Sequence, residues 1–129
     1  MERVILVADD EPHIRLLIEQ SLEDLVDEGV TLLTVGDGQA ALDTIRDRRP
    51  SLVVLDAMMP KVNGFDVCHA VRGELALSDV FVIILTAKGQ EADRQRGAEV
   101  GANLYMTKPF DPDELLRIAR DALEADGER

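Results

Sequence analysis

The segment Val4-Ile-Leu-Val-Ala-Asp-Asp-Glu-Pro12 joins an unbroken apolar run to three consecutive carboxylates and then to a proline. Five apolar residues without polar alternation are typical of a strand that is buried on both faces. Proline suits the first turn of a helix, because the amide hydrogen that it lacks has no helical partner there. The segment therefore predicts a buried strand, an acidic loop and the start of a helix.

This order of apolar run and amphipathic stretch occurs five times along the chain. The apolar runs lie at residues 4–8, 30–35, 52–56, 80–86 and 103–107, and the helical patterns at 14–25, 39–48, 65–71, 91–100 and 111–123. Strands covered on both faces, alternating with helices, are typical of a parallel sheet between two helical layers. We therefore expect an α/β fold of five strand–helix units, a doubly wound, flavodoxin-like sheet in the order 2-1-3-4-5.

Helix faces and helix ends follow from the same patterns. The residues expected to face the core are Ile14, Leu17, Ile18, Leu22 and Leu25 in the first helix, Leu42 and Ile45 in the second, and Leu115, Ile118, Ala119 and Leu123 in the last. Asp111, Pro112 and Glu114 resemble a capping box at the start of that last helix. Gly101 is expected to end the preceding helix in a left-handed conformation.

Length and charge restrict the class of protein. A chain of 129 residues suits one domain, so residues 1–129 are interpreted as a single domain without an output domain. The 26 acidic and 14 basic residues give a net charge of −12, which argues against direct binding to nucleic acid or to a membrane surface. The longest apolar runs are too short to span a membrane, and the single cysteine suits a reducing compartment. We expect a cytoplasmic protein.

Polar side chains follow the ends of the predicted strands. Asp9, Asp10 and Glu11 follow the first, Asp56 ends the third, Thr86 ends the fourth, and Lys108 follows the fifth. Parallel strands end at one edge of the sheet, and neighbouring strands lie about 4.8 Å apart, so these side chains should meet. Two carboxylates about 4 Å apart repel by roughly 4 kcal/mol at an effective dielectric of about 20. The group therefore needs cations, and Lys108 with Mg²⁺ would supply them, Mn²⁺ being the expected substitute.

Four segments carry a family resemblance. They are Val4-Ile-Leu-Val-Ala-Asp-Asp-Glu-Pro12, Val53-Val-Leu-Asp-Ala-Met-Met-Pro60, Ile83-Ile-Leu-Thr-Ala-Lys88 and Gly101-Ala-Asn-Leu-Tyr-Met-Thr-Lys-Pro-Phe110. Together they resemble the receiver domains of two-component response regulators. The resemblance extends over nearly the whole chain. It implies a signalling domain that changes partners, rather than an enzyme with turnover.

The resemblance also implies a role for each residue at the sheet edge. Asp56 would accept a phosphoryl group from a sensor histidine kinase, a phosphotransfer protein or a small phosphodonor. The metal ligands would be Asp9, directly or through water, Asp10, Asp56 and the backbone carbonyl of Met58. Thr86, Ala87 and Lys108 would contact the phosphoryl group, Thr86 and Tyr105 would form the switch, and the Lys108–Pro109 peptide would be cis. A downstream protein would bind the surface of the 91–100 helix, the fifth strand and the last helix.

Other functions share parts of this pattern. A phosphatase of the dehalogenase type also uses an aspartate nucleophile and Mg²⁺, but it needs a second aspartate where Met58 stands. A flavodoxin-like FMN-binding module should have hydroxyls and glycines, not Asp-Asp-Glu, after its first strand. The segment Gly36-Asp-Gly38 imitates part of a dinucleotide-binding fingerprint, but Asp37 would face the pyrophosphate. All three remain alternatives at the level of the sequence.

Overall fold

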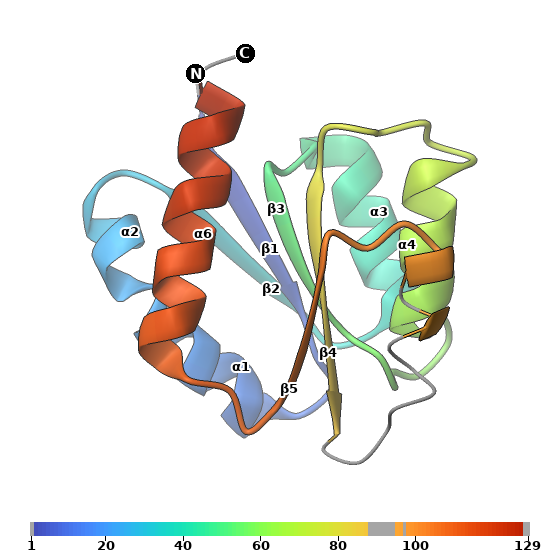
Figure 1. Cartoon of the computed structure of the whole chain (residues 1–129), viewed down its shortest axis with the longest axis horizontal. Helices are drawn as coiled ribbons and strands as arrows, with labels where there is room; N and C mark the ends of the chain where they lie inside the picture. The colour runs from blue at the N-terminus through green and yellow to red at the C-terminus, as the bar shows by residue number, and fades with distance from the viewer. Residues whose placement is uncertain (1, 88–94, 97, 128–129) are drawn as a thin grey trace.

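The fold is a five-stranded parallel sheet with helices on both faces (Figure 1). A computed structural model of the chain describes residues 2–87, 95, 96 and 98–127. The elements are β1 (Val4–Ala8), α1 (Pro12–Ser21), α2 (Glu23–Asp27), β2 (Thr31–Val35), α3 (Gly38–Arg48), β3 (Leu52–Asp56), α4 (Gly64–Arg72), β4 (Phe81–Ala87), β5 (Leu104–Lys108) and α6 (Pro112–Gly127). The strand order is β2-β1-β3-β4-β5 and every pairing is parallel. The predicted fold class and strand order are confirmed.

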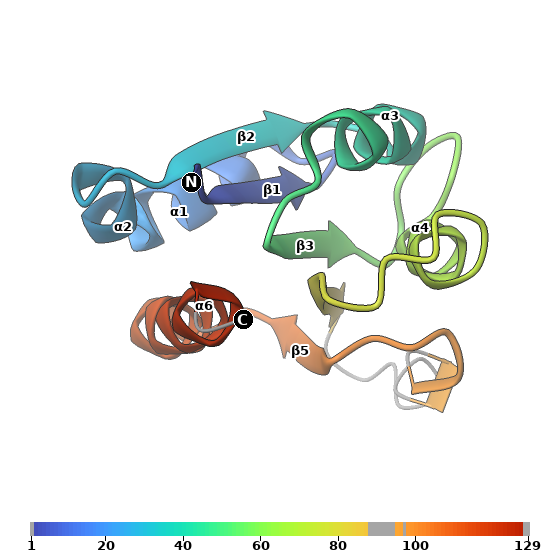
Figure 2. The same ribbon diagram turned by 90° about the horizontal axis from the view of Figure 1, so that it is seen from above.

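Alternate residues of the central strands face two separate cores. Ile5 and Val7 of β1 pack with α1, α2 and α6, whereas Leu6 and Ala8 pack with α3 and α4. Figure 2 shows these two helical layers on either side of the sheet. All five residues of β1 and of β3 are buried. This burial on both faces explains why the strands are continuous apolar runs in the sequence.

The first helical pattern is divided into two helices, which the spacing of apolar residues did not predict. Leu22 leaves the helical conformation at φ −104° and ψ 10°, between α1 and α2. Ile18, Leu22 and Leu25 are buried as expected, but Leu17 is 37% exposed. Successive helical residues are about 100° apart around the axis, so Leu17 lies at the margin of a face centred on Ile18 and Leu22.

Several smaller expectations concern the second half of the chain. Gly101 has a φ of +88°, as predicted for a left-handed helix end. Ile118 is only partly buried, whereas Leu115, Ala119 and Leu123 are buried as expected. The helix predicted at 91–100 lies partly outside the described residues. Within this range, residues 95, 96, 98 and 99 are described as helical. Within the described residues, no helix is long and apolar enough to cross a membrane.

The start of α3 explains the glycines and the aspartate at 36–38. The Asp37 carboxylate accepts a hydrogen bond of 2.8 Å from the Ala40 amide and caps the helix. Gly38 lies directly against the backbone of Val62, and a Cβ at this position would overlap the Val62 carbonyl. The segment therefore has a structural role in joining α3 to the loop that follows β3.

The start of α4 lies against the end of β3. Asn63 caps the helix by accepting a hydrogen bond of 2.9 Å from the Asp66 amide. The Gly64 amide donates a hydrogen bond to the Ala57 carbonyl at 3.0 Å. A Cβ on Gly64 would overlap the Asp56 carbonyl and lie 3.1 Å from the Ala57 Cα. This close approach fixes the loop beyond Asp56.

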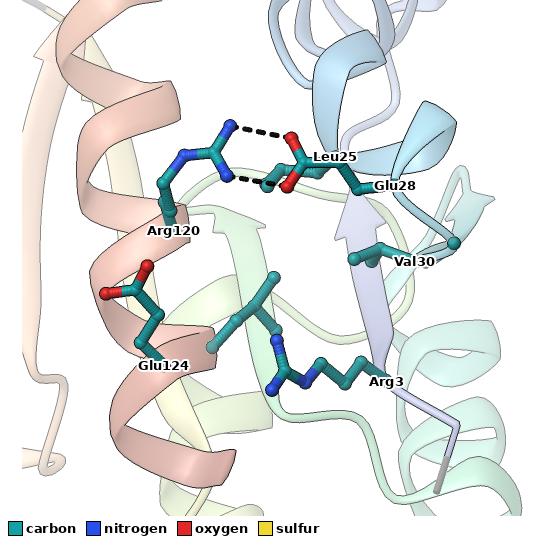
Figure 3. Close-up of a pocket in the computed structure, with 8 residues that line it drawn as sticks. Arg3, Leu25, Glu28, Val30, Arg120 and Glu124 are labelled. Carbon is teal, nitrogen blue, oxygen red and sulfur yellow. Dashed lines mark hydrogen bonds and ion pairs between the residues drawn. The ribbon is translucent and has the colours of Figure 1, made fainter. Parts of the chain in front are cut away.

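An ion pair joins the C-terminal helix to the end of α2. Arg120 on α6 donates hydrogen bonds of 2.7 and 2.9 Å to the two carboxylate oxygens of Glu28 (Figure 3). Arg3 and Glu124 line the same hollow. Both charged side chains are partly exposed, so the pair orients α6 more than it stabilises the fold.

Replacing Gly64 with alanine tests the close packing behind Asp56. We expect the free energy of unfolding of Gly64→Ala to fall by about 1–3 kcal/mol, because the added methyl group overpacks a rigid backbone contact. Urea unfolding measures the change. Gly73→Ala is the control, because its methyl group would lie 3.2 Å from the His69 carbonyl and requires only a small adjustment. Equal destabilisation of both variants would show that the contact with Asp56 is not the cause.

Candidate functional site

The sheet register brings the polar residues of four strands to one edge. Ala8 of β1 is opposite Leu55 of β3, so the next residue of each strand, Asp9 and Asp56, lie side by side. Ala87 of β4 is opposite Lys108 of β5. The proximity predicted from the strand ends is therefore present. The functional roles given to these residues stay predictions.

Asp9 is fully buried, whereas the neighbouring Asp10 and Glu11 are exposed. Its Oδ1 accepts a hydrogen bond of 2.9 Å from the Glu11 amide, and its backbone carbonyl accepts one of 2.6 Å from Arg15 Nη1. Its Oδ2 lies 2.9 Å from Lys108 Nζ, an ion-pair distance, yet it accepts no hydrogen bond from any described residue. A buried carboxylate oxygen in this state has spare capacity for a cation.

Lys108 carries the positive charge of the site. Its Nζ lies 3.3 Å from Asp56 Oδ1 and 3.5 Å from Glu11 Oε1, in addition to the contact with Asp9. Burial lowers the pKa of Lys108, but the ion pair with Asp9 and the nearby charge of Asp56 outweigh it and raise the pKa. The ammonium group therefore stays charged between the carboxylates.

Asp56 has the most perturbed carboxyl group at this edge. Burial raises its pKa to about 6, and the neighbouring Asp9 charge acts in the same direction. Lys108 and the Met58 amide, which donates a hydrogen bond of 3.3 Å to Asp56 Oδ1, oppose the rise. The carboxyl group is thus mostly ionised at neutral pH, and its charge is stabilised only in part.

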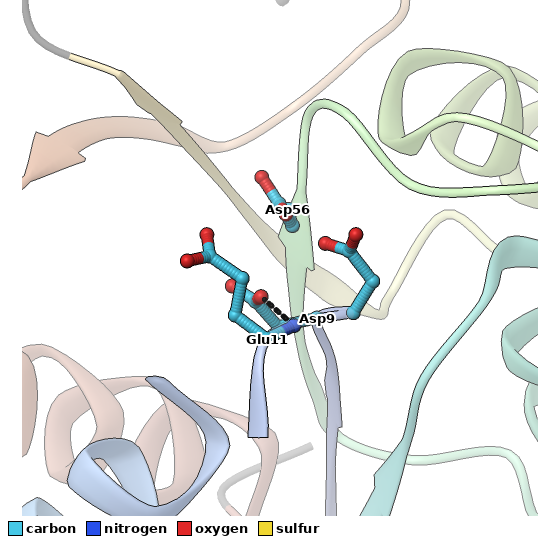
Figure 4. A group of neighbouring side chains, drawn as sticks. Asp9, Glu11 and Asp56 are labelled. Carbon is cyan, nitrogen blue, oxygen red and sulfur yellow. Dashed lines mark hydrogen bonds between the residues drawn. The ribbon is translucent and has the colours of Figure 1, made fainter. Parts of the chain in front are cut away.

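Four carboxylates could share one metal ion at this edge. Asp9, Asp10, Glu11 and Asp56 each offer an oxygen, and these oxygens lie within 4.8 Å of one another. Figure 4 shows Asp9, Glu11 and Asp56 in this group, with the hydrogen bond from the Glu11 amide to Asp9. Hard oxygen ligands and the unsatisfied Asp9 Oδ2 suit Mg²⁺. The residues therefore fit the predicted metal.

Most of the predicted residues line one cleft at this edge of the sheet. A cleft of about 320 Å³ is lined by Asp10, Glu11, Asp56, Met58, Thr86, Ala87 and Lys108. Thr86 is buried at the end of β4, and Ala87 is exposed beside it. Tyr105 is half-buried on β5, opposite Ile84. The Lys108–Pro109 peptide bond is cis, as the resemblance implies.

Two contacts of the site could not be predicted from the sequence. Glu11 belongs to the predicted acidic group, but no pattern in the sequence indicates its contact with Lys108. Arg15, whose guanidinium holds the Asp9 carbonyl, is not among the predicted site residues. Its position one turn into α1, four residues after Glu11, is the available signal. That signal is weak, because any helix of this length can carry an arginine there.

Several known proteins are similar to this chain over most of its length. A sequence model of the response regulator receiver domain matches residues 5–120. The "Probable transcriptional regulator ycf27" of Porphyra purpurea is 46% identical over 92% of this chain and 46% of its own length. PhoP of Bacillus subtilis, an alkaline phosphatase synthesis transcriptional regulatory protein, is 41% identical over 89% of this chain and 46% of its own. This chain therefore spans about half the length of these relatives.

A solved structure is similar over almost the whole chain. The BeF3-activated receiver domain of DrrB, a protein of Thermotoga maritima, superposes with a TM-score of 0.84 and 30% sequence identity. The match covers 96% of this chain and 99% of that domain. The shared fold thus includes all four strands that carry the candidate site.

Because the pKa of Asp56 is raised, its ionisation should lower the free energy of unfolding as the pH increases. The folded state binds the proton more tightly than the unfolded state, whose pKa is near 3.8. The tighter proton binding of folded Asp56 therefore stabilises the folded state. This stabilisation is complete below pH 4 and is lost as the pH rises through about 6. Without divalent metal at pH 8, Asp56→Asn should therefore raise the free energy of unfolding by about 1–3 kcal/mol, a gain that shrinks toward pH 4.

Urea unfolding in EDTA at several pH values measures this difference. Asp47→Asn, at an exposed position of α3, is the control and should show little change at any pH. If Asp56→Asn is less stable than the wild type at pH 8, the ion pair with Lys108 outweighs the cost of burial and the argument is wrong.

Proposed function

Because this chain belongs to the response regulator receiver domain family, we propose that Asp56 accepts a phosphoryl group from a histidine kinase or phosphotransfer protein. The observation that carries the proposal is the Asp56 carboxylate at the end of a central strand, 3.3 Å from Lys108 Nζ and facing an open cleft. Phosphorylation then changes which protein binds to the domain. The family match also favours this function over the phosphatase and the flavin-binding alternatives.

Asp56 would act as the nucleophile. One of its oxygens attacks the phosphorus atom, the bond from phosphorus to the donor's nitrogen breaks, and the electron pair of that bond stays on the donor imidazole. The attacking group has to be ionised, and a pKa of about 6 leaves it mostly ionised at neutral pH. Partial destabilisation of the charge also favours its conversion into an acyl phosphate, because the oxygen that forms the new bond loses its charge.

Lys108 would neutralise the charge of the incoming group. Its ammonium is anchored by the buried Asp9 at 2.9 Å and already lies within reach of Asp56. Positioning and charge neutralisation are the main requirements of phosphoryl transfer. A phosphoryl group on Asp56 would then replace its carboxylate charge as the partner of Lys108.

Asp9, Asp10, Asp56 and the Met58 carbonyl would hold a Mg²⁺ ion, which when bound would offset the negative charge on the phosphoryl oxygens. Asp9 would act directly or through water. The Met58 amide keeps Asp56 oriented by donating a hydrogen bond to Oδ1. Glu11, whose Oε1 lies 3.5 Å from Lys108 Nζ, would help to hold the ammonium group in place.

The switch would begin at Thr86 and Tyr105. Thr86 lies at the end of β4 beside the cleft, and its hydroxyl together with the Ala87 backbone would contact the phosphoryl oxygens. Tyr105, half-buried on the neighbouring strand, would then move inward. These contacts would bias the population between two packings of the surface of β5 and α6, where a downstream protein would bind.

Incubation with acetyl phosphate tests the phosphoacceptor. With Mg²⁺ present, the intact mass should increase by one phosphoryl group, and EDTA should prevent the increase. Asp56→Asn should abolish it, whereas Asp47→Asn should leave it unchanged. Phosphorylation of Asp56→Asn to the wild-type level would refute the assignment of the phosphoacceptor.

The metal site predicts that Mg²⁺ stabilises the folded protein. Binding to the folded state alone raises its stability in proportion to the logarithm of the metal concentration. We expect Mg²⁺ to raise the melting temperature of the wild type and to have a much smaller effect on Asp10→Asn. Scanning calorimetry measures the shift, and Glu74→Gln, which removes an exposed charge elsewhere, is the control. Equal shifts in Asp10→Asn and the wild type would remove Asp10 from the proposed ligands.

A further inference from the structure

Two of the four large apolar side chains that are exposed in the described part of the chain lie in one groove. Leu16 on α1 is 53% exposed and Val26 on α2 is 42% exposed. With Leu32 of β2 they line a groove of about 450 Å³, whose other lining residues are Glu19, Gln20 and Glu23. We call it the α1–β2 groove. Figure 2 shows β2 as the outermost strand of the sheet on this side.

The rim of the α1–β2 groove carries unbalanced negative charge. No described residue forms an ion pair with the side chain of Glu19 or Glu23 or donates a hydrogen bond to it. Arg15 is engaged by the Asp9 carbonyl, and Arg120 by the Glu28 carboxylate. The groove thus combines an apolar floor with carboxylates that no cation within the described chain neutralises.

We propose that the α1–β2 groove binds a basic amphipathic helix of a partner protein. Apolar side chains of such a helix would contact Leu16, Val26 and Leu32, and its lysines or arginines would pair with Glu19 and Glu23. Helices bind grooves through apolar residues spaced three and four apart, with charged residues alongside. Charge complementarity of this kind sets the partner and its orientation.

The backbone of β2 favours a helix over an added strand as the occupant of the groove. On β2, the Thr31 amide and the Val35 carbonyl bond toward β1. Because backbone groups alternate along a strand, only Leu32 and Thr34 direct their amide and carbonyl groups outward. An added strand would therefore gain few hydrogen bonds.

Charge also argues against a second copy of this chain as the occupant. The chain has a net charge of −12, so two copies repel each other. Two-fold pairing of the groove would place Glu19 and Glu23 against the same acidic rim. A partner with basic residues removes this repulsion. None of the six groove residues lines the cleft at Asp56, so binding should not require phosphorylation.

The probe for this proposal is a fluorescein-labelled peptide of about fourteen residues, or nearly four helical turns, built from leucine, alanine and lysine. Its leucines are placed at helical spacing on one face and its lysines beside them. One control peptide has the same composition in a scrambled order, and another has glutamate in place of lysine. Fluorescence anisotropy gives the affinities, and amide NMR shifts of the full chain locate the bound peptide.

Variants of exposed residues identify the groove as the binding surface. Leu16→Ser/Val26→Ser should weaken binding of the lysine peptide by about tenfold or more. Leu17→Ser is the matched control on the same helix, because Leu17 is exposed but does not line the groove. Glu19→Gln/Glu23→Gln should weaken binding of the lysine peptide and reduce the dependence of that binding on salt. Glu74→Gln/Glu124→Gln is the charge control, because it removes the same charge outside the groove and should leave binding unchanged. Circular dichroism and acetyl phosphate labelling confirm that each variant is folded.

The outcomes separate the groove from general attraction to an acidic protein. The proposal is supported if the lysine peptide changes the amide NMR shifts of α1, α2 and β2 and if only the groove variants weaken binding of the peptide. It is overturned if the peptide does not bind, if the scrambled peptide binds as tightly, or if Leu17→Ser or the distant charge control weakens binding equally. Failure of this test leaves the phosphoacceptor function unaffected, because that function is measured separately by mass.

Discussion

The mutual repulsion of Asp9 and Asp56 governs the chemistry of the site. Neither carboxylate has much access to water, and the register of β1 and β3 holds them side by side. The amides of Glu11 and Met58 and the ammonium of Lys108 offset part of this repulsion. Burial of Asp56, together with the repulsion that remains, raises its pKa. Asp9 Oδ2 accepts no hydrogen bond from the described residues. The site is therefore built to receive further positive charge.

The parallel sheet makes this arrangement rigid. The strands that carry the two aspartates, β1 and β3, lie between two helical layers, so neither can slide without exposing one of two cores. The loop after β3 is held on its other side by Gly38 and Gly64, whose missing Cβ atoms allow backbone contacts with Val62 and Asp56. The carboxylates at the sheet edge are costly to bury. They are held in place by the apolar packing of the strands and by the close backbone contacts of Gly38 and Gly64.

The two candidate binding regions of the molecule use acidic residues in different ways. At the sheet edge, carboxylates are buried, close together and partly neutralised by Lys108, which suits a small cation and a phosphoryl group. In the α1–β2 groove, Glu19 and Glu23 border apolar side chains at an exposed surface, which suits a larger basic partner. Six of the 26 acidic residues therefore belong to two chemically distinct surfaces.

The fold class, the strand order and the residues at the sheet edge could all be predicted from the sequence alone. Buried parallel strands require apolar runs, and residues such as Asp56 and Lys108 stand at the ends of those runs. Three-dimensional packing was needed to establish where α1 ends, that Leu17 is exposed, and that Glu11 and Arg15 contact the site. These features depend on distances between segments that local spacing does not encode. The α1–β2 groove has the same origin, because it forms only where two helices and an edge strand meet.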